Sequence, residues 1–152
     1  MAPTNILIND DFDINDVCVG SIIWYTDTGF DSDEWHPHAV IAIDNKICYT
    51  VCGTSQKETI QRKARHLNLA DYSCFPLVSP TLTNKLSKDT FFDCLDYFEI
   101  HLYDLEDKFE SGEGVKVSGK ITYSDYTQIR NALRSSPTLD IEDLLVHPDD
   151  DL

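Results

Sequence analysis

Two runs of strand-forming residues joined by an Asp-Asn pair constrain the fold of this chain more than any other feature. The runs are residues 38–43 and 46–52, which consist largely of Val, Ile, Ala, Tyr, Thr and Cys. Short runs rich in β-branched and aromatic residues are typical of strands. Asn and Asp tolerate positive φ angles, so the pair between the runs favours a tight turn. The segment therefore predicts an antiparallel hairpin with its turn at Asp44-Asn45.

Local patterns predict three further elements. Residues 20–25 and 73–78 are expected to be strands, the second at a sheet edge because Pro76 has no N–H for the ladder. Residues 123–134 are expected to form a helix, since their apolar side chains recur at helical spacing. Thr122 precedes this segment as an N-cap residue.

Residues 89–109 fit two structures. Phe91, Leu95, Phe98 and Leu102 are spaced four, three and four residues apart, which favours one face of a helix. The aromatic composition of the same segment is typical of strands. The periodicity taken alone favours the helix.

The chain is strongly acidic. Among its 152 residues, 12 Lys and Arg side chains stand against 27 Asp and Glu side chains, which gives a net charge of −15. Such a charge repels nucleic acid at long range, so RNA binding needs a local positive field. Four of the 12 basic side chains lie within residues 57–66. The acidity itself fits either an ordinary soluble protein or a mimic of nucleic acid.

The sequence predicts neither a membrane span nor a metal site. No apolar run approaches the roughly 18 residues that a span needs, and the N-terminus lacks the basic region of a secretory signal, so a cytoplasmic protein is expected. The five cysteines include no CxxC pair, and we interpret them as reduced thiols. A zinc site that combines them with His36, His38 or His66 matches no standard spacing, so we expect no metal and no cofactor.

Three short motifs follow one another along the chain. Residues 19–24 are a Val-Gly step into a strand. Residues 36–41 are a His-Pro step into a second strand, and the hairpin that it opens ends in Gly-Thr-Ser-Gln at residues 53–56. Residues 119–125 lead into the last helix. In this order the motifs resemble those of the PemK/MazF-like toxin family.

The resemblance covers residues 19–135. It implies a mainly β fold, namely an SH3-like β-barrel with a C-terminal helix, flanked by an acidic extension at residues 1–18 and an acidic tail at residues 136–152. Members of the family are usually homodimers, cut single-stranded RNA without a metal, and often occur with an antitoxin protein. These three partners, RNA, antitoxin and a second copy, are therefore implied here. Since the family has strands in the matching region, the resemblance favours strands over residues 90–102.

The resemblance also implies a catalytic site. The family commonly has an arginine where this chain has His36, just before Pro37. A histidine moves protons near neutral pH but does not reproduce a bidentate guanidinium group. Thr54 and Ser55 match the family's hydroxyl pair, whose O–H groups bond to phosphate or ribose oxygens. We therefore predict His36, Thr54 and Ser55 as catalytic residues.

Four side chains are predicted to bind the RNA substrate. His38 lies two residues after His36, so the two imidazoles share one face of a strand. Trp35 follows a polar loop and is expected to stack on a base. The planar guanidinium groups of Arg62 and Arg65 suit phosphate. The alternative interpretation of these residues is structural: a loop before a strand, a partly exposed strand start and an ordinary solvated charged face.

The residues leave three functions open. The first is a metal-independent endoribonuclease toxin, with Asp93 and Asp96 in the region where some members of the family carry a catalytic acid. The second is a non-catalytic member of the same fold that acts through a protein or RNA partner. The missing arginine and the charge of −15 favour this second function. The third is a small acidic inhibitor that mimics nucleic acid.

Overall fold

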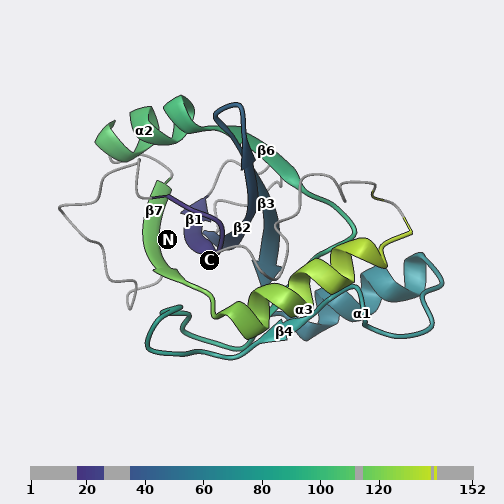
Figure 1. Cartoon of the computed structure of the whole chain (residues 1–152). Helices are drawn as coiled ribbons and strands as arrows, with labels where there is room; N and C mark the ends of the chain where they lie inside the picture. Colours follow the sequence, from purple (N-terminus) through teal and green to yellow (C-terminus); the bar gives the residue numbers. More distant parts are fainter. Residues whose placement is uncertain (1–16, 26–34, 112–114, 138, 140–152) are drawn as a thin grey trace.

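The computed structural model describes residues 17–25, 35–111, 115–137 and 139 (Figure 1). The N-terminal sixteen residues of the predicted extension and residues 140–152 of the predicted tail lie outside this range. The described elements, in chain order, are β1 (Ser21–Tyr25), β2 (His36–Asp44), β3 (Ile47–Thr54), α1 (Lys57–His66), β4 (Leu77–Val78), β5 (Thr90–Phe92), β6 (Phe98–His101), α2 (Leu102–Ser111), β7 (Val115–Lys120) and α3 (Tyr123–Arg134).

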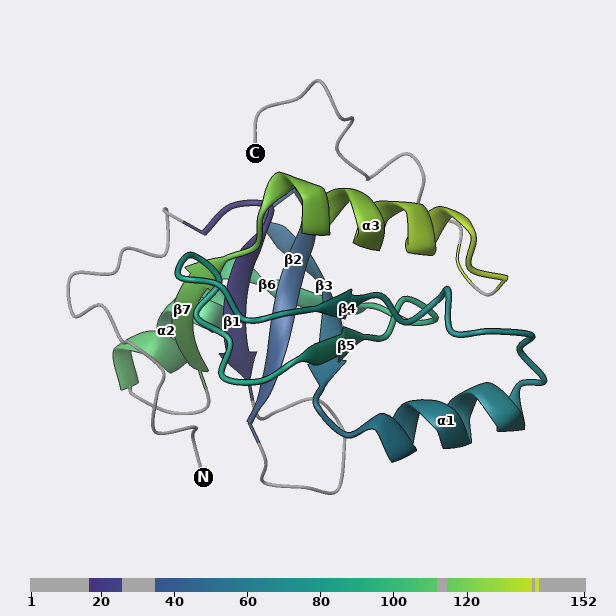
Figure 2. The ribbon, with the colours of Figure 1, turned by 90° about the horizontal axis from the view of Figure 1, so that it is seen from below.

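The strands form one curled antiparallel sheet in the order β4-β5-β3-β2-β1-β7. One edge of β3 pairs with β2, and the other edge pairs with two strands. On that other edge, the first half of β3 pairs with β6 and its last residues pair with β5. The sheet therefore splits at β3 and curls into a half-barrel (Figure 2). The predicted mainly β, barrel-like fold is confirmed at this level.

The predicted hairpin is confirmed, but its turn lies one residue later than expected. Asp44 is the last residue of β2 and pairs with Ile47, so the turn consists of Asn45 and Lys46. Both turn residues have positive φ angles, 49° and 65°. A two-residue turn of this handedness matches the twist of the flanking strands. Asn45 tolerates this conformation readily, which explains why the hairpin forms here although a lysine takes the second position.

Helix α3 covers one face of the sheet and has the bounds that the sequence predicts. The side chain of Thr122 accepts a hydrogen bond from the Asp125 N–H at 3.1 Å, which confirms it as the N-cap. Tyr126, Ile129 and Leu133 are buried against the sheet. The Tyr126 hydroxyl donates to the carbonyl of Ile41 on β2 at 3.1 Å, so this helix is tied to the sheet by a buried polar contact as well as by apolar burial.

Helix α2 closes the opposite face of the sheet, where Leu105 packs with Ile23, Val40 and Cys48. This helix resolves the ambiguous segment. Residues 90–92 and 98–101 are strands, as the resemblance favours, and the helical spacing is realised only after them, over Leu102–Ser111. Strand β6 ends at His101, and α2 begins at the next residue. In the first turn of this helix, Leu105 is part of the apolar cluster on this face and Leu102 packs against it.

Three parts of the fold differ from the local predictions. The strand expected over residues 73–78 contains only Leu77 and Val78, because the N–H of Phe75 bonds to the carbonyl of Tyr72 in a turn. Helix α1 and strand β7 are not predicted from local patterns. Helix α1 packs through Ile60 and Ala64 on a third apolar cluster beside β5.

Among the described residues, no helix is long and apolar enough to cross a membrane.

Candidate functional site

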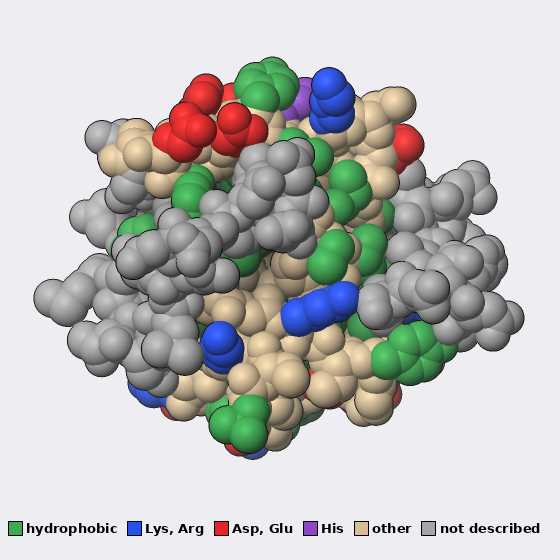
Figure 3. All heavy atoms as spheres, turned by 60° about the vertical axis from the view of Figure 1, so that its left-hand side comes forward, with side chains coloured by type: hydrophobic (Ala, Val, Ile, Leu, Met, Phe, Trp, Pro, Cys, Tyr) green, Lys and Arg blue, Asp and Glu red, His purple; other side chains and the backbone are tan. Residues whose placement is uncertain are grey.

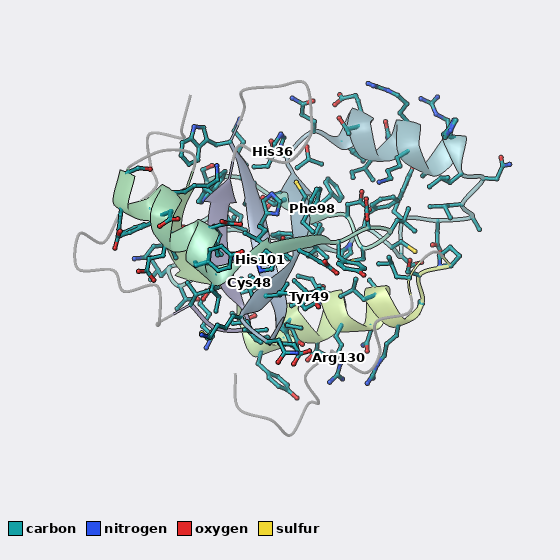
Figure 4. All side chains as sticks on the ribbon, turned by 90° about the horizontal axis from the view of Figure 1, so that it is seen from above. His36, Cys48, Tyr49, Phe98, His101 and Arg130 are labelled. Atoms are coloured by element: carbon teal, nitrogen blue, oxygen red, sulfur yellow. The ribbon has the colours of Figure 1, made fainter. Side chains whose placement is uncertain are left out.

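The predicted catalytic residues lie at the start of β2, at the end of β3 and in the segment that joins β3 to α1. His36 begins β2 and pairs with Tyr25 of β1. Thr54 ends β3, whose pairing with β2 reaches His38 opposite Cys52. Pro37 and Gly53, the next residues along the two strands, also lie close together. A Cβ atom added to Gly53 would be 3.2 Å from Cγ of Pro37. By this register, His36 and Thr54 lie at the same end of neighbouring strands, the end that leads into α1. Figure 4 labels His36 at this end of the sheet.

The two hydroxyl residues differ in their surroundings. Thr54 Oγ1 accepts a hydrogen bond from the Gln56 N–H at 3.1 Å and so shapes the turn before α1. Its O–H remains able to donate, because that contact uses only a lone pair. Ser55 is exposed. The pair thus offers one oriented hydroxyl and one accessible hydroxyl beside the start of β2.

His38 occupies a different environment from the one that substrate binding requires. Its ring is fully buried, and Nδ1 lies 2.9 Å from Oγ1 of Thr50 on β3. The ring also makes an edge contact with Phe98, with centroids 5.2 Å apart. Burial, with a smaller contribution from His36, lowers the pKa of His38 to about 3. The structure therefore assigns His38 to the core as a neutral imidazole, and corrects its prediction as a substrate-binding residue.

The predicted phosphate ligands lie on the outward side of α1. Ile60 and Ala64 define the buried side of this helix. Arg62 follows Ile60 by two residues, which turns it about 200° away from the core. Arg62 and Arg65 are both exposed. The structure thus brings His36 and Thr54 together at one end of the sheet and sets the two arginines on the solvent face of the helix that follows.

A third basic residue of α1 is engaged in the fold. Lys63 forms an ion pair with Asp93, which follows β5. Asp93 also accepts a hydrogen bond from the Leu95 N–H at 2.9 Å, and its own N–H donates to the carbonyl of Cys52. These contacts tie α1 to the segment between β5 and β6. They give Asp93 a structural role that the sequence does not signal, because its partner lies 30 residues away.

The aromatic side chains are more buried than base stacking requires. Trp35, predicted to stack on a base, is half-buried against the core beneath α3. Trp24 lies in that core, and its Nε1–H donates to Ser118 Oγ at 3.1 Å. Tyr49 is half-buried and lies beside Tyr97, with ring centroids 5.8 Å apart. None of these three side chains is an open stacking platform in this conformation.

The negative charge of the chain lies outside the described residues. Residues 1–16, 26–34, 112–114 and 140–152 contain 15 of the 27 acidic side chains and none of the 12 Lys and Arg side chains. The described residues therefore carry 12 side chains of each sign. This part of the chain is neutral as a whole, so the net charge of −15 is not a property of the sheet and its helices.

Within the described residues the two signs are separated in space. Helix α2 carries four exposed acidic side chains, namely Asp104, Glu106, Asp107 and Glu110. Its one basic side chain, Lys108, is half-buried. The acidic side chains gather over α2 in the view of Figure 3. Helix α1, which carries four basic side chains and one acidic one, lies on the opposite side of the molecule (Figures 1 and 2). The fold therefore has an acidic side at α2 and a basic side at α1.

The thiols and the remaining polar groups give no constellation for a metal among the described residues. All five cysteines are free. Burial raises the pKa of the Cys48 and Cys52 thiols to about 12, and burial also raises the pKa of Cys94 and Cys74. Protonated thiols are poor nucleophiles and poor metal ligands. The candidate chemistry thus rests on His36 and the two hydroxyls.

No protein-family model matches the chain, and no curated protein matches it.

Proposed function

We propose that the protein is a metal-independent endoribonuclease that cleaves single-stranded RNA at the strand ends bearing His36, Thr54 and Ser55. The observation that carries this proposal is the adjacency of His36 and Thr54 at one end of the β2–β3 pair, next to the basic helix α1. An imidazole and two hydroxyls are the groups that transfer of a ribose proton and stabilisation of a phosphate require.

The residues have distinct roles in the proposed reaction. The 2′-oxygen of the ribose bonds to phosphorus while the bond from phosphorus to the 5′-oxygen breaks. His36 takes the proton from the 2′-hydroxyl, and a water molecule supplies the proton that the leaving 5′-oxygen takes up. Thr54 and Ser55 donate hydrogen bonds to the phosphate oxygens, where negative charge grows in the transition state. Arg62 and Arg65 hold the flanking backbone phosphates.

The neutrality of the described residues removes one objection to this proposal. A net charge of −15 spread over the binding surface would repel RNA strongly. Here the acidic excess belongs to other segments of the chain, and α1 supplies a local positive field. The SH3-like barrel of the PemK/MazF type, the homodimer and the antitoxin partner that the resemblance implies belong to this same proposal. The curled antiparallel sheet with a C-terminal helix is consistent with that type.

The experiment is incubation of the pure protein with single-stranded RNA of mixed sequence, with and without EDTA. We expect cleavage that the chelator does not affect, because none of the proposed steps uses a metal. His36→Ala is expected to reduce the cleavage rate on the order of 10²- to 10⁴-fold, the usual contribution of a general base. The matched control is His66→Ala, which removes an exposed imidazole at the far end of α1. Loss of cleavage with EDTA, or equal loss in both variants, would reject the mechanism.

A second function is favoured by the acidic side of the molecule. The four exposed acidic side chains of α2 form a surface that suits a basic partner protein, as expected of a non-catalytic binding module. If the parent protein neither binds nor cleaves single-stranded RNA at low salt, this binding module replaces the endoribonuclease.

A further inference from the structure

We propose that the acidic segment of residues 140–152 docks on the outward basic face of α1 and competes with RNA for Arg62 and Arg65. The competition deepens the proposed function and rests on it, whereas the docking itself does not. Three features of the molecule favour this docking: the charge of the segment, the chemistry of the face that receives it, and the place where the segment leaves the fold.

The segment has the composition of a polyanion with apolar residues between its charges. Residues 140–152 contain six Asp and Glu side chains and no Lys or Arg. Leu144, Leu145 and Val146 stand between the first acidic group and the last. Its carboxylates offer the same charge and the same acceptor oxygens as backbone phosphates, so a surface that binds one also binds the other.

The receiving face has matching chemistry. Arg62 and Arg65 are exposed, and among the described residues neither guanidinium group has an ion pair or hydrogen bond. Lys63, in contrast, is already paired with Asp93. Leu67, the residue that directly follows the helix, is a large apolar side chain with 43% of its surface exposed. The face therefore offers free positive charge next to apolar surface.

The position of the segment favours α1 over the rest of the surface. The C-terminal ends of α3 and α1 lie on the same side of the molecule in both ribbon views (Figures 1 and 2). The thirteen residues after Leu139 span at most about 45 Å when extended, against about 15 Å for a helix as long as α1. The acidic side chains of α2, on the other side of the molecule, repel the segment.

The test uses full-length variants and a readout that needs no RNA. The tail variant replaces Asp143, Asp149, Asp150 and Asp151 by Asn. The matched control replaces Asp10, Asp11, Asp13 and Asp16 by Asn, and so removes the same charge from the other end of the chain. The Nε–H signals of Arg62 and Arg65 are followed by NMR at about 10 mM and about 1 M ionic strength, where the Debye lengths are about 30 Å and about 3 Å.

Docking predicts a specific pattern in these signals. At low salt, the tail variant shows the Arg62 and Arg65 signals at the positions that the parent reaches only at high salt. The N-terminal control variant behaves as the parent does. Equal shifts in the two variants would mean that only the net charge matters, and no shift in either would mean that the segment does not contact α1. Both of these results overturn the proposal.

A second measurement tests the competition. A fluorescently labelled single-stranded RNA of mixed sequence should bind the tail variant on the order of tenfold more tightly than the parent at low salt, with the difference lost at high salt. An NMR effect without RNA binding by any variant upholds the docking and rejects the ribonuclease. Equal RNA binding by parent and tail variant rejects the competition. Equal RNA binding together with unchanged NMR signals rejects the docking and leaves the ribonuclease standing.

Discussion

His38 Nδ1 lies 2.9 Å from Thr50 Oγ1, and both residues are fully buried between β2 and β3. This contact crosses the central strand pair of the sheet, two residues from the strand end where His36 lies. Because protonation would place a charge in the core, the fold holds the imidazole in its neutral form. The two neighbouring histidines of β2 therefore have different roles: His38 supports the sheet, and His36 is the residue proposed to act on RNA.

The first prediction concerns the pH dependence of stability. The pKa of His38 falls from 6.5 to about 3 on folding, so the unfolded chain binds a proton more readily than the folded one. The contribution of neutral His38 to the free energy of unfolding is therefore complete above pH 6.5. It is lost as the pH falls towards 3, at up to about 1.4 kcal/mol per pH unit. Urea unfolding at pH 7 and pH 4.5 measures this loss. His38→Asn should have a lower free energy of unfolding at pH 7 and a smaller decrease on acidification.

The control for this prediction is His66→Asn, which changes an exposed histidine. It should retain the pH slope of the parent. A His38→Asn variant with the same slope as the parent would contradict the assignment of the slope to His38.

The second prediction concerns the close approach of two backbones at β7. A Cβ atom on Gly119 would lie 2.4 Å from the carbonyl oxygen of Thr83 and 2.6 Å from that of Asn84. The obstacle is backbone that is itself bonded, since the Lys120 N–H donates to Thr83. Gly119→Ala should therefore lower the free energy of unfolding by about 1–3 kcal/mol, the usual cost of overpacking. Thermal and urea unfolding measure the change.

A matched variant for the second prediction is Ser87→Ala, at an exposed position of the loop that approaches β7. It should change the free energy of unfolding by no more than about 0.5 kcal/mol. Parent-like stability of Gly119→Ala would show that the loop moves away from β7 without cost.

The third prediction concerns the N-cap of α3. Thr122→Ala removes the oxygen that accepts the Asp125 N–H and should cost about 1 kcal/mol of unfolding free energy. Because α3 contributes buried side chains to the core on one face of the sheet, the loss should appear in global unfolding as well as in helix content. Thr122→Ser keeps the acceptor and should remain near the parent, and an equal loss in both variants would argue against capping.

The fourth prediction concerns the solvent face of α1. Replacing Arg62 and Arg65 together by Ala should weaken binding to all single-stranded RNA sequences and flatten its salt dependence, because two phosphate contacts are lost. A gel shift over a range of salt concentrations measures both effects. The control variant carries Lys46→Gln and Lys108→Gln, which remove two positive charges from the β2–β3 turn and from α2. Equal weakening in the two variants would show that net charge alone governs binding.

Short-range patterns predict the elements whose structure depends on neighbouring residues. The hairpin follows from two strand-forming runs with an Asn between them, and Asn45 does take a positive φ angle. The bounds of α3 follow from the cap at Thr122 and from its apolar stripe. The predicted turn is one residue too early, because Asp44 pairs with Ile47 and so belongs to the strand. Asn45 and Lys46 then remain as the two turn residues.

The sequence by itself determined the hairpin, the capped C-terminal helix and the acidic composition, because each depends on residues close together in the chain or on their number. Only the tertiary structure decided which segments meet. In the folded protein, β3 pairs with both β5 and β6, and Lys63 forms an ion pair with Asp93. The ring of His38 is buried in edge contact with Phe98. The basic side chains of α1 and the acidic side chains of α2 lie on separate sides of the molecule. These relations join residues far apart in the chain, so they depend on register and on shared burial, which no local propensity encodes.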